Sequence, residues 1–226
     1  MKRFGWITAL VLVCTVNAVA QPTETLVVPP YPADVAWKQI MDQRAAGAMH
    51  MREWIPADQT ENDIRDILVQ QNAYALKSLT PSIFVISQFR TLISACEGLK
   101  VNGPTERIEG DYTVAYSQMY CTNQKGAAKD VDIFVKAIGG KDALYVVQRE
   151  FRRPATPGAK PGVRSFSGDQ ADAAKAAMEA QASASSYLRR VRLCPSAEPE
   201  NTRFFMAKAA IVTMFVGEQL TRAFLM

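Results

Sequence analysis

The single histidine of this 226-residue chain is the first residue that could do chemistry. His50 lies between Met49 and Met51, and imidazole with thioether ligands suits copper. Residues 48–55 alternate like a β-strand, however, so both methionines face the side opposite His50. One histidine also excludes multi-histidine zinc sites and restricts any Ser-His-Asp or Cys-His arrangement to His50. We therefore predict no metal site and no cofactor, and we identify no catalytic residue.

Carboxylates are the other candidates for catalysis. Asp63 with Asp66, and Asp130 with Asp132, are close enough in sequence to act as pairs, but solvated acids are far commoner than buried pairs. No GxGxxG, phosphate-loop or GxSxG motif is present, and Gly139–Asp142 is typical of a hairpin turn. A carboxylate-based hydrolase acting on glycan remains an alternative, which requires two carboxyl groups facing each other across a groove.

Four cysteines set the redox chemistry. Cys14 lies in the N-terminal apolar stretch, which leaves Cys96, Cys121 and Cys194 in the rest of the chain. We expect Cys96 to pair with Cys121, which would join the end of a helix to a strand across about 25 residues and stabilise the fold by roughly 3 kcal/mol. Cys194 would then be a free thiol or would pair with another chain. Pairing of Cys194 with Cys121 or with Cys96 is the alternative.

Residues 110–153 have the pattern of an antiparallel β-meander. Three runs rich in β-branched and aromatic residues are separated by Gly-containing turns, and their side chains alternate with a period of two. Gly139-Gly140 separates the last two runs, where a hairpin turn requires positive φ. Tyr112, Tyr116 and Phe134 could line a ligand cleft on this sheet, although alternating aromatic residues are more often core.

Helices are predicted to cover this meander. Thr80-Pro81 is typical of a helix start, apolar residues at helical spacing follow to Cys96, and Gly98 could serve as a C-cap. An Ala-rich helix is expected over 169–193. The predicted fold class is α+β, an antiparallel meander sheet of about four strands with helices segregated to one face.

The remaining segments are expected to be helical or extended. A short helix is predicted over 34–44, another after Thr60, and an amphipathic helix over Arg203–Met226. The chain then divides into a signal peptide (1–20), an extended leader and short helix (21–47), an α+β domain (48–195), and a C-terminal linker and amphipathic helix (196–226).

The first twenty residues are organised like a cleavable signal peptide. Lys2 and Arg3 form a basic start, Ile7–Val16 is apolar, and Ala18–Ala20 is a small-x-small cleavage site. The apolar run is short for a membrane span, which needs about 20 residues. We therefore predict a periplasmic or secreted protein whose mature N-terminus is near Gln21, in a compartment where disulfides can form.

The charge of the chain argues against nucleic-acid binding. Net charge falls from +4 to +2 once the signal peptide is removed, which is not the charge of a nucleic-acid-binding domain. Between Arg149 and Arg192, nine Lys or Arg residues stand against four Asp or Glu residues. This region could meet an acidic envelope surface. A solvated basic face is the alternative.

Three strings carry a resemblance to a known family. They are Glu53–Asn62 (EWIPADQTEN), close to EWxPxGQTxxNW; Val135–Arg149 (VKAIGGKDALYVVQR), close to FKAIxGxDxxYVVQ; and Tyr187–Cys194 (YLRRVRLC), close to YLxxVxVC. In this order they resemble a family of small exported proteobacterial proteins. Asp63-Ile64 stands where the first motif has its second aromatic residue, and Pro195–Asn201 lacks a further cysteine. The resemblance implies export and an α+β fold over roughly 48–195, and it transfers no function and no active site.

The sequence favours a non-catalytic exported module for binding or envelope interaction. Its partner would be an envelope protein or a membrane surface, contacted through the helix predicted over Arg203–Met226. The alternative is a small-ligand binding protein whose aromatic cleft is lined by Tyr112, Tyr116 and Phe134.

Overall fold

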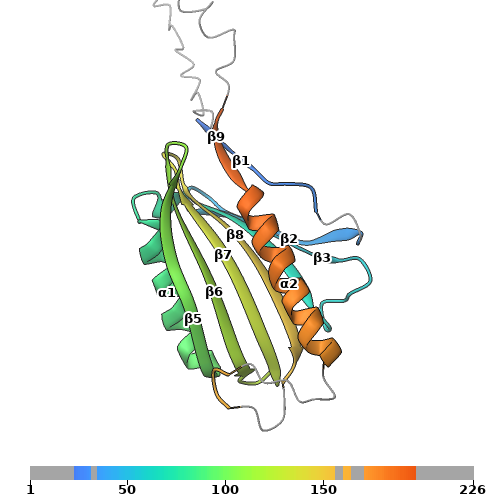
Figure 1. Ribbon diagram of the computed structural model, residues 1–226. Helices are drawn as coiled ribbons and strands as arrows, with labels where there is room; N and C mark the ends of the chain where they lie inside the picture. The colour runs from blue at the N-terminus through green and yellow to red at the C-terminus, as the bar shows by residue number, and fades with distance from the viewer. Residues whose placement is uncertain (1–22, 32–34, 156–159, 164–170, 197–226) are drawn as a thin grey trace, which may run out of the picture.

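The computed structural model describes residues 23–31, 35–155, 160–163 and 171–196. These residues form an α+β domain in which a seven-stranded antiparallel sheet lies between two α-helices (Figure 1). A separate two-stranded sheet stands at one end of it. The predicted signal peptide (1–20) and the helix predicted over 203–226 lie outside the described residues.

The described elements follow one another in a simple order. They are β1 (Glu24–Val27), β2 (Trp37–Ala45), β3 (Met49–Pro56), β4 (Asp66–Ala73), the 3₁₀ helix η1 (Tyr74–Leu76), α1 (Pro81–Ala95), β5 (Cys96–Glu109), β6 (Tyr112–Gln124), β7 (Lys129–Gly139), β8 (Leu144–Pro154), α2 (Ala171–Arg190) and β9 (Arg192–Pro195). The large sheet has the strand order β2-β3-β4-β8-β7-β6-β5, and β1 pairs with β9.

The predicted meander is confirmed as β6, β7 and β8, with β5 added at its edge. Side chains alternate between the two faces of the sheet, as the period of two requires. Val114 and Phe134 belong to the core on one face, and their neighbours Ala115 and Val135 belong to the core on the other. Strand β7 is buried on both faces because α1 packs on one face and α2 on the other.

The helices lie on opposite faces, so the expectation that they share one face is wrong. Phe84 and Val85 of α1 pack into the core of one face, and α1 lies against β5, β6 and β7. Tyr187 and Leu188 of α2 pack into the core of the other face, and α2 lies against β7 and β8. Figure 1 shows the two helices on either side of the sheet.

The sheet has seven strands, not four, because two stretches expected to be helical are strands. Trp37–Ala45 is β2, and a β-bulge between Gln39 and Met41 shifts its alternation by one residue. The bulge makes the apolar residues of this stretch imitate helical spacing. Asp66–Ala73 is β4, an interior strand whose consecutive residues Ile67 and Leu68 are both buried, one on each face.

Helix α1 begins as predicted and ends earlier than predicted. Thr80 is the N-cap and Pro81 the first helical residue, although the Thr80 side chain makes no capping hydrogen bond. The helix ends at Ala95, so Gly98 is not its C-cap. Gly98 instead lies in β5, where the backbone of Pro161-Gly162 comes so close that a Cβ atom would clash.

Strand β1 is clamped to the turn between β7 and β8. A carboxylate oxygen of Glu24 accepts hydrogen bonds from the backbone N–H groups of Lys141 (2.8 Å) and Asp142 (3.2 Å). Asp142 in turn accepts hydrogen bonds from the backbone N–H and the hydroxyl of Thr23. Gly140 is required here for space and not for positive φ as predicted, because a Cβ atom would run into the Glu24 carboxylate.

Candidate functional site

An open groove beside α2 is the principal candidate site. Because α2 covers β7 and β8, the same face of β5 and β6 stays open next to it (Figure 1). Two adjoining cavities of about 290 and 330 Å³ lie there, and both are lined by Asn102 and Gln118. We call these two cavities the α2 groove. Their volumes are at the small end of the range for ligand sites, roughly 300–1,000 Å³.

The α2 groove combines cations with apolar walls. Lys100 and Arg107 reach it from β5 and Arg189 from α2, and the described residues that line it include no carboxylate. Phe134 and Leu188 supply apolar surface. Positive charge next to apolar surface suits an anion that also carries a hydrophobic part.

The register of β5 explains why these cations share one face. A register shift between Asn102 and Thr105 changes the phase of the strand, so Asn102 and Arg107 lie on the same face although they are five residues apart. Thr105 pairs with Tyr116, and Arg107 with Val114, a core residue of the α2 face. The α2 groove therefore depends on this irregularity in β5.

Tyr116 links the groove to a charged cluster beneath it. The Arg107 guanidinium lies over the Tyr116 ring, 4.4 Å from its centroid, and the Tyr116 hydroxyl donates a hydrogen bond of 2.8 Å to Glu109. Burial, and secondly the hydrogen bond to Glu109, raise the pKa of Tyr116 to about 12. Tyr116 therefore stays neutral at physiological pH and acts as a hydrogen-bond donor.

Glu109 collects three hydrogen-bond donors. Arg107, Tyr116 and the ammonium of Lys136 all donate to its carboxylate. Burial acts to raise the pKa of Glu109, but the hydrogen bonds from Lys136, Tyr116 and Arg107 together lower it below its ordinary value. The cluster thus holds two cations around one carboxylate, which adds to the positive potential of the groove.

The predicted cleft residues are only partly brought together. Tyr116 and Phe134 both line the α2 groove. Tyr112 is on the same face of the sheet but is only 7% exposed, and it lines a different cavity of about 230 Å³ beside Cys194. The beginning of β6 and its middle therefore line different cavities, because β9 lies near the first and α2 near the second (Figure 1).

Much of the basic region between Arg149 and Arg192 is neutralised inside the domain. Arg149 makes two hydrogen bonds to the Asp66 carboxylate, at 3.2 and 2.8 Å, and a third to Ser183 of α2. Arg152 pairs with Glu150, and Arg153 pairs with Asp132. The exposed cations that remain among the described residues of this region are Lys160, Lys175, Arg189, Arg190 and Arg192.

The carboxylates suggested as catalytic pairs have structural partners. Asp66 is held by Arg149, whereas Asp63 is exposed near Arg65. Asp130 is buried and accepts hydrogen bonds from the Tyr120 hydroxyl and the Asn123 backbone N–H. The sequence could not show these partners. Asp66 joins β4 to β8 through Arg149, and Asp130 joins β7 to β6 through Tyr120.

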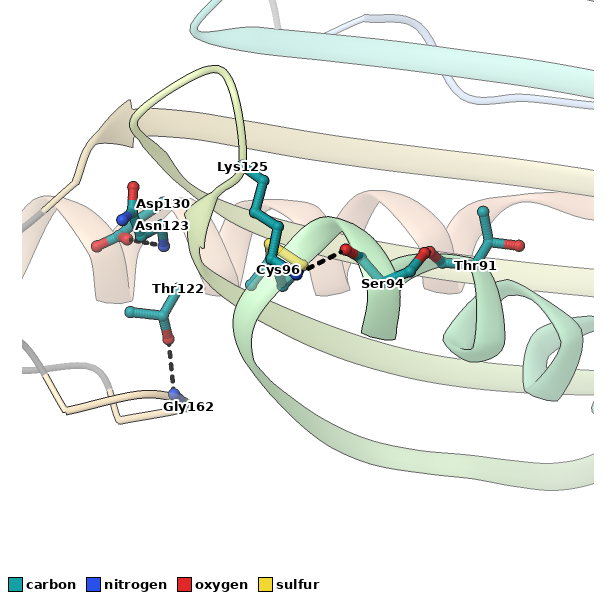
Figure 2. The surroundings of a disulfide bond; sticks show 9 residues. Thr91, Ser94, Cys96, Thr122, Asn123, Lys125, Asp130 and Gly162 are labelled. Carbon is teal, nitrogen blue, oxygen red and sulfur yellow. Dashed lines mark hydrogen bonds between the residues drawn. A yellow bond between two sulfur atoms is a disulfide. The ribbon is translucent and has the colours of Figure 1, made fainter.

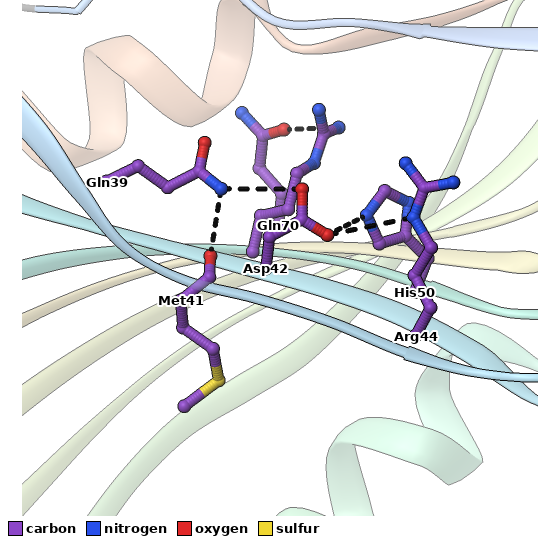
Figure 3. Close-up of polar contacts among 7 residues, drawn as sticks. Gln39, Met41, Asp42, Arg44, His50 and Gln70 are labelled. Atoms are coloured by element: carbon purple, nitrogen blue, oxygen red, sulfur yellow. Dashed lines mark hydrogen bonds and ion pairs between the residues drawn. The ribbon is translucent and has the colours of Figure 1, made fainter.

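His50 forms a surface pair with Asp42. Its Nε2 atom lies 2.9 Å from an Asp42 carboxylate oxygen (Figure 3). The hydrogen bond to His50 is the main cause that lowers the pKa of Asp42. Met49–Pro56 is a strand, as predicted for residues 48–55, which places Met49 and Met51 on the face opposite His50. In the part of the chain that the structure describes, no three His, Cys, Asp or Glu side chains gather as a metal site.

The predicted disulfide between Cys96 and Cys121 is confirmed (Figure 2). It joins the first residue of β5, directly after α1, to β6, with 5.5 Å between the two Cα atoms. Next to it, the hydroxyl of Thr122 accepts a hydrogen bond from the Gly162 backbone N–H. Within the described residues, Cys194 on β9 is a free, partly exposed thiol.

Fold and groove together define a class of protein. It is an α+β domain with a seven-stranded antiparallel sheet between two helices and an open, basic groove beside the second helix. Comparison with protein-family models and with curated proteins finds no match to this chain. The family resemblance therefore stays a prediction. Neither helix of the described residues has the length and apolarity needed to cross a bilayer.

Proposed function

We propose that this domain is a non-catalytic binding module that takes a small anion with an apolar part in the α2 groove. The observation that carries this proposal is the lining of the groove, which combines Lys100, Arg107 and Arg189 with apolar walls and no carboxylate among the described residues. Oxygens of the anion would accept hydrogen bonds from the guanidinium groups. Its apolar part would lie against Phe134 and Leu188.

Rigid positioning supports binding as the role of this site. Arg107 is held by the Glu109 carboxylate and by the Tyr116 ring, so little side-chain freedom is lost when a ligand arrives. Arg189 is exposed on the last turn of α2, where it can adjust to ligands of different size. One fixed and one adjustable cation suit a site that holds an anion without reacting with it.

We also propose export, on the signal-peptide pattern of residues 1–20. The Cys96–Cys121 disulfide supports it, because disulfides persist mainly in oxidising compartments. A small anion bound outside the cytoplasm would then be the ligand. The predicted contact of Arg203–Met226 with an envelope protein or membrane surface is a further proposal that rests on the sequence pattern alone.

The groove can be tested with an aromatic sulfonate as the probe. Fluorescence titration of 1-anilinonaphthalene-8-sulfonate should show binding to the full chain that Arg189→Glu weakens about tenfold, because one cation of the site becomes an anion. Arg190→Glu is the matched control, since Arg190 is also exposed on the same turn but does not line the groove. It should change the affinity less than about twofold.

A second probe separates charge recognition from apolar binding. N-phenyl-1-naphthylamine has the same rings without the sulfonate, so it should bind more weakly and should not respond to Arg189→Glu. Equal weakening of the sulfonate by both arginine variants, or equal binding of the two probes, would show that the α2 groove is not an anion site.

A further inference from the structure

A cavity of about 440 Å³ lies where the small sheet meets the large one, and it shares no lining residue with the α2 groove. One wall is formed by β1 and Ser196. The other wall carries Arg52 of β3, Asn72 of β4 and Tyr145 of β8. We call this space the β1 cavity. Crevices between two packed units are common ligand sites.

The β1 cavity runs along an edge of β1. Glu24, Thr25 and Leu26 are consecutive, so their side chains alternate between the two faces of the strand, yet all three line the cavity. A space that meets both faces of a strand lies along its edge, where the backbone N–H and C=O groups point. One edge of β1 pairs with β9, and within the described residues no strand pairs with the other (Figure 1). The cavity therefore borders the unpaired edge.

The opposite wall offers a cation and an amide. Arg52 pairs with Gln70, which lies two residues from Asn72 on β4, and Asn72 pairs with Tyr145, so all four side chains share one face of the large sheet. Arg52 donates a single hydrogen bond, of 3.0 Å, to Gln70, and most of its N–H donors remain for a ligand. Arg52 and Tyr145 stand on either side of β4, roughly 10 Å apart across the strands.

The end of the cavity beside Tyr145 is negatively charged. Glu24 is 4% exposed, and one of its carboxylate oxygens accepts both hydrogen bonds from the β7–β8 turn. The other oxygen has no hydrogen-bond partner among the described residues. Burial first, and then the charge of Glu24, raise the pKa of Tyr145. Tyr74 adds a second aromatic ring to this wall. An incompletely compensated carboxylate beside two aromatic rings attracts an ammonium group.

The direction of the chain suits a ligand that spans both ends of the cavity. Glu24 is held at the β7–β8 turn, and from there the chain runs to Tyr31, whose ring lies 5.7 Å from the ring of Trp54 on β3, centroid to centroid. The edge of β1 therefore runs from the Tyr145 end of the cavity towards its Arg52 end.

We propose that the β1 cavity binds a short peptide, extended along the unpaired edge of β1, with its carboxyl terminus at Arg52 and its amino terminus beside Glu24. Three extended residues span roughly 10 Å, which matches the separation of the two ends. The unpaired backbone groups of β1 would bond the peptide backbone, as in strand addition to a sheet edge. Arg52 would hold the carboxylate through two N–H groups. The site is independent of the function proposed for the α2 groove.

Calorimetric titration with trialanine tests the charge recognition. The full chain should bind trialanine, and trialanine amide, which lacks the carboxylate, should bind about tenfold more weakly. Arg52→Gln should weaken trialanine binding by a similar factor and leave the amide unaffected, because both changes remove the same ion pair. Arg44→Gln is the matched control, since Arg44 pairs with His50 on the same face of the sheet but does not line the cavity. It should leave both affinities unchanged.

Amide hydrogen exchange then locates the bound peptide. Saturating trialanine should slow the exchange of β1 amides and leave those of β5, which borders the α2 groove, unchanged. Arg189→Glu should not alter trialanine binding. The proposal would be overturned by equal binding of trialanine and its amide to the wild-type chain, which needs no variant, or by the absence of binding. Weakening by Arg189→Glu in place of Arg52→Gln, or protection confined to β5, would also overturn it.

Discussion

The side-chain nitrogen of Lys136 lies 2.7 Å from a carboxylate oxygen of Glu109 and 2.6 Å from the carbonyl oxygen of Val191. Lys136 is completely buried, whereas about a quarter of the Glu109 side chain remains exposed (24%). A buried ammonium without its carboxylate is costly, because its charge is no longer compensated. This pair therefore fixes β5 and β7 to the end of α2, directly beneath the α2 groove.

Removal of the Glu109 charge should destabilise the domain in a pH-dependent way. Glu109→Gln should lower the free energy of unfolding at pH 7 by roughly 1–3 kcal/mol, since Lys136 then keeps only neutral acceptors. The pKa of Glu109 is lowered in the folded protein from its ordinary 4.5. Its contribution is therefore fully present above about pH 4.5 and is lost as the pH falls through the folded pKa.

Urea denaturation of wild type and Glu109→Gln measures this difference. The gap between the two proteins should be large at pH 7, begin to shrink below about pH 4.5, and disappear as the pH falls through the lower pKa of the folded carboxylate. Glu97→Gln, which alters an exposed glutamate of the same strand, should change stability by less than about 0.5 kcal/mol. A gap that stays constant across the pH range would contradict the ion pair.

Loss of the Cys96–Cys121 disulfide should lower stability by roughly 3 kcal/mol, because its loop of 25 residues is then unrestrained in the unfolded chain. The double variant Cys96→Ala, Cys121→Ala and the reduced wild type should both show this loss in urea. Cys194→Ser should be close to wild type, since this thiol is unbridged in the described residues. An unfolding midpoint that does not respond to reductant would contradict this prediction.

The clamp between Glu24 and the β7–β8 turn should hold the small sheet in place. Glu24→Ala removes both hydrogen bonds to the turn, so the amides of β1 and β9 should exchange with solvent faster by about tenfold or more. Gly140→Ala should act in the same direction, because its Cβ atom displaces the Glu24 carboxylate. Asp111→Ala, on the exposed turn before β6, is the control. Unchanged exchange in both clamp variants would show that β1 is held by other contacts.

The sequence predicted the meander, α1 and α2 because each depends on local pattern, and the disulfide because Cys96 was expected at the end of a helix beside the first meander strand. Alternation along β6 to β8, the Thr80-Pro81 start and the Ala-rich stretch are all signals within one element. Strand β2 was missed because its bulge between Gln39 and Met41 imitates helical spacing. Strand β4 was missed because an interior strand loses its alternation when both faces are buried.

The α2 groove was predictable only in part. Tyr116 and Phe134 share a face because of simple alternation, and both line the α2 groove. Arg107 was missed because it depends on the register shift in β5, and Arg189 because nothing in the sequence gives the position of α2 over the sheet. Tyr112 lines a different cavity, together with residues of β9. The one sequence signal for the basic groove was Arg107, which lies two positions before Glu109 on the strand that leads into the meander.

The strand order of the large sheet also sets the order in which it can assemble. Strands β2 to β4 form one antiparallel group. Strand β4 also pairs with β8, the last strand of the large sheet in sequence, so that Asp66 lies opposite Phe151 and Ala73 opposite Leu144. Closing so long a loop is slow compared with forming the adjacent hairpins of β5 to β8. We therefore expect the β4 edge of residues 37–73 to stay unpaired until β8 has folded, and the meander to be the template onto which the first half of the domain docks.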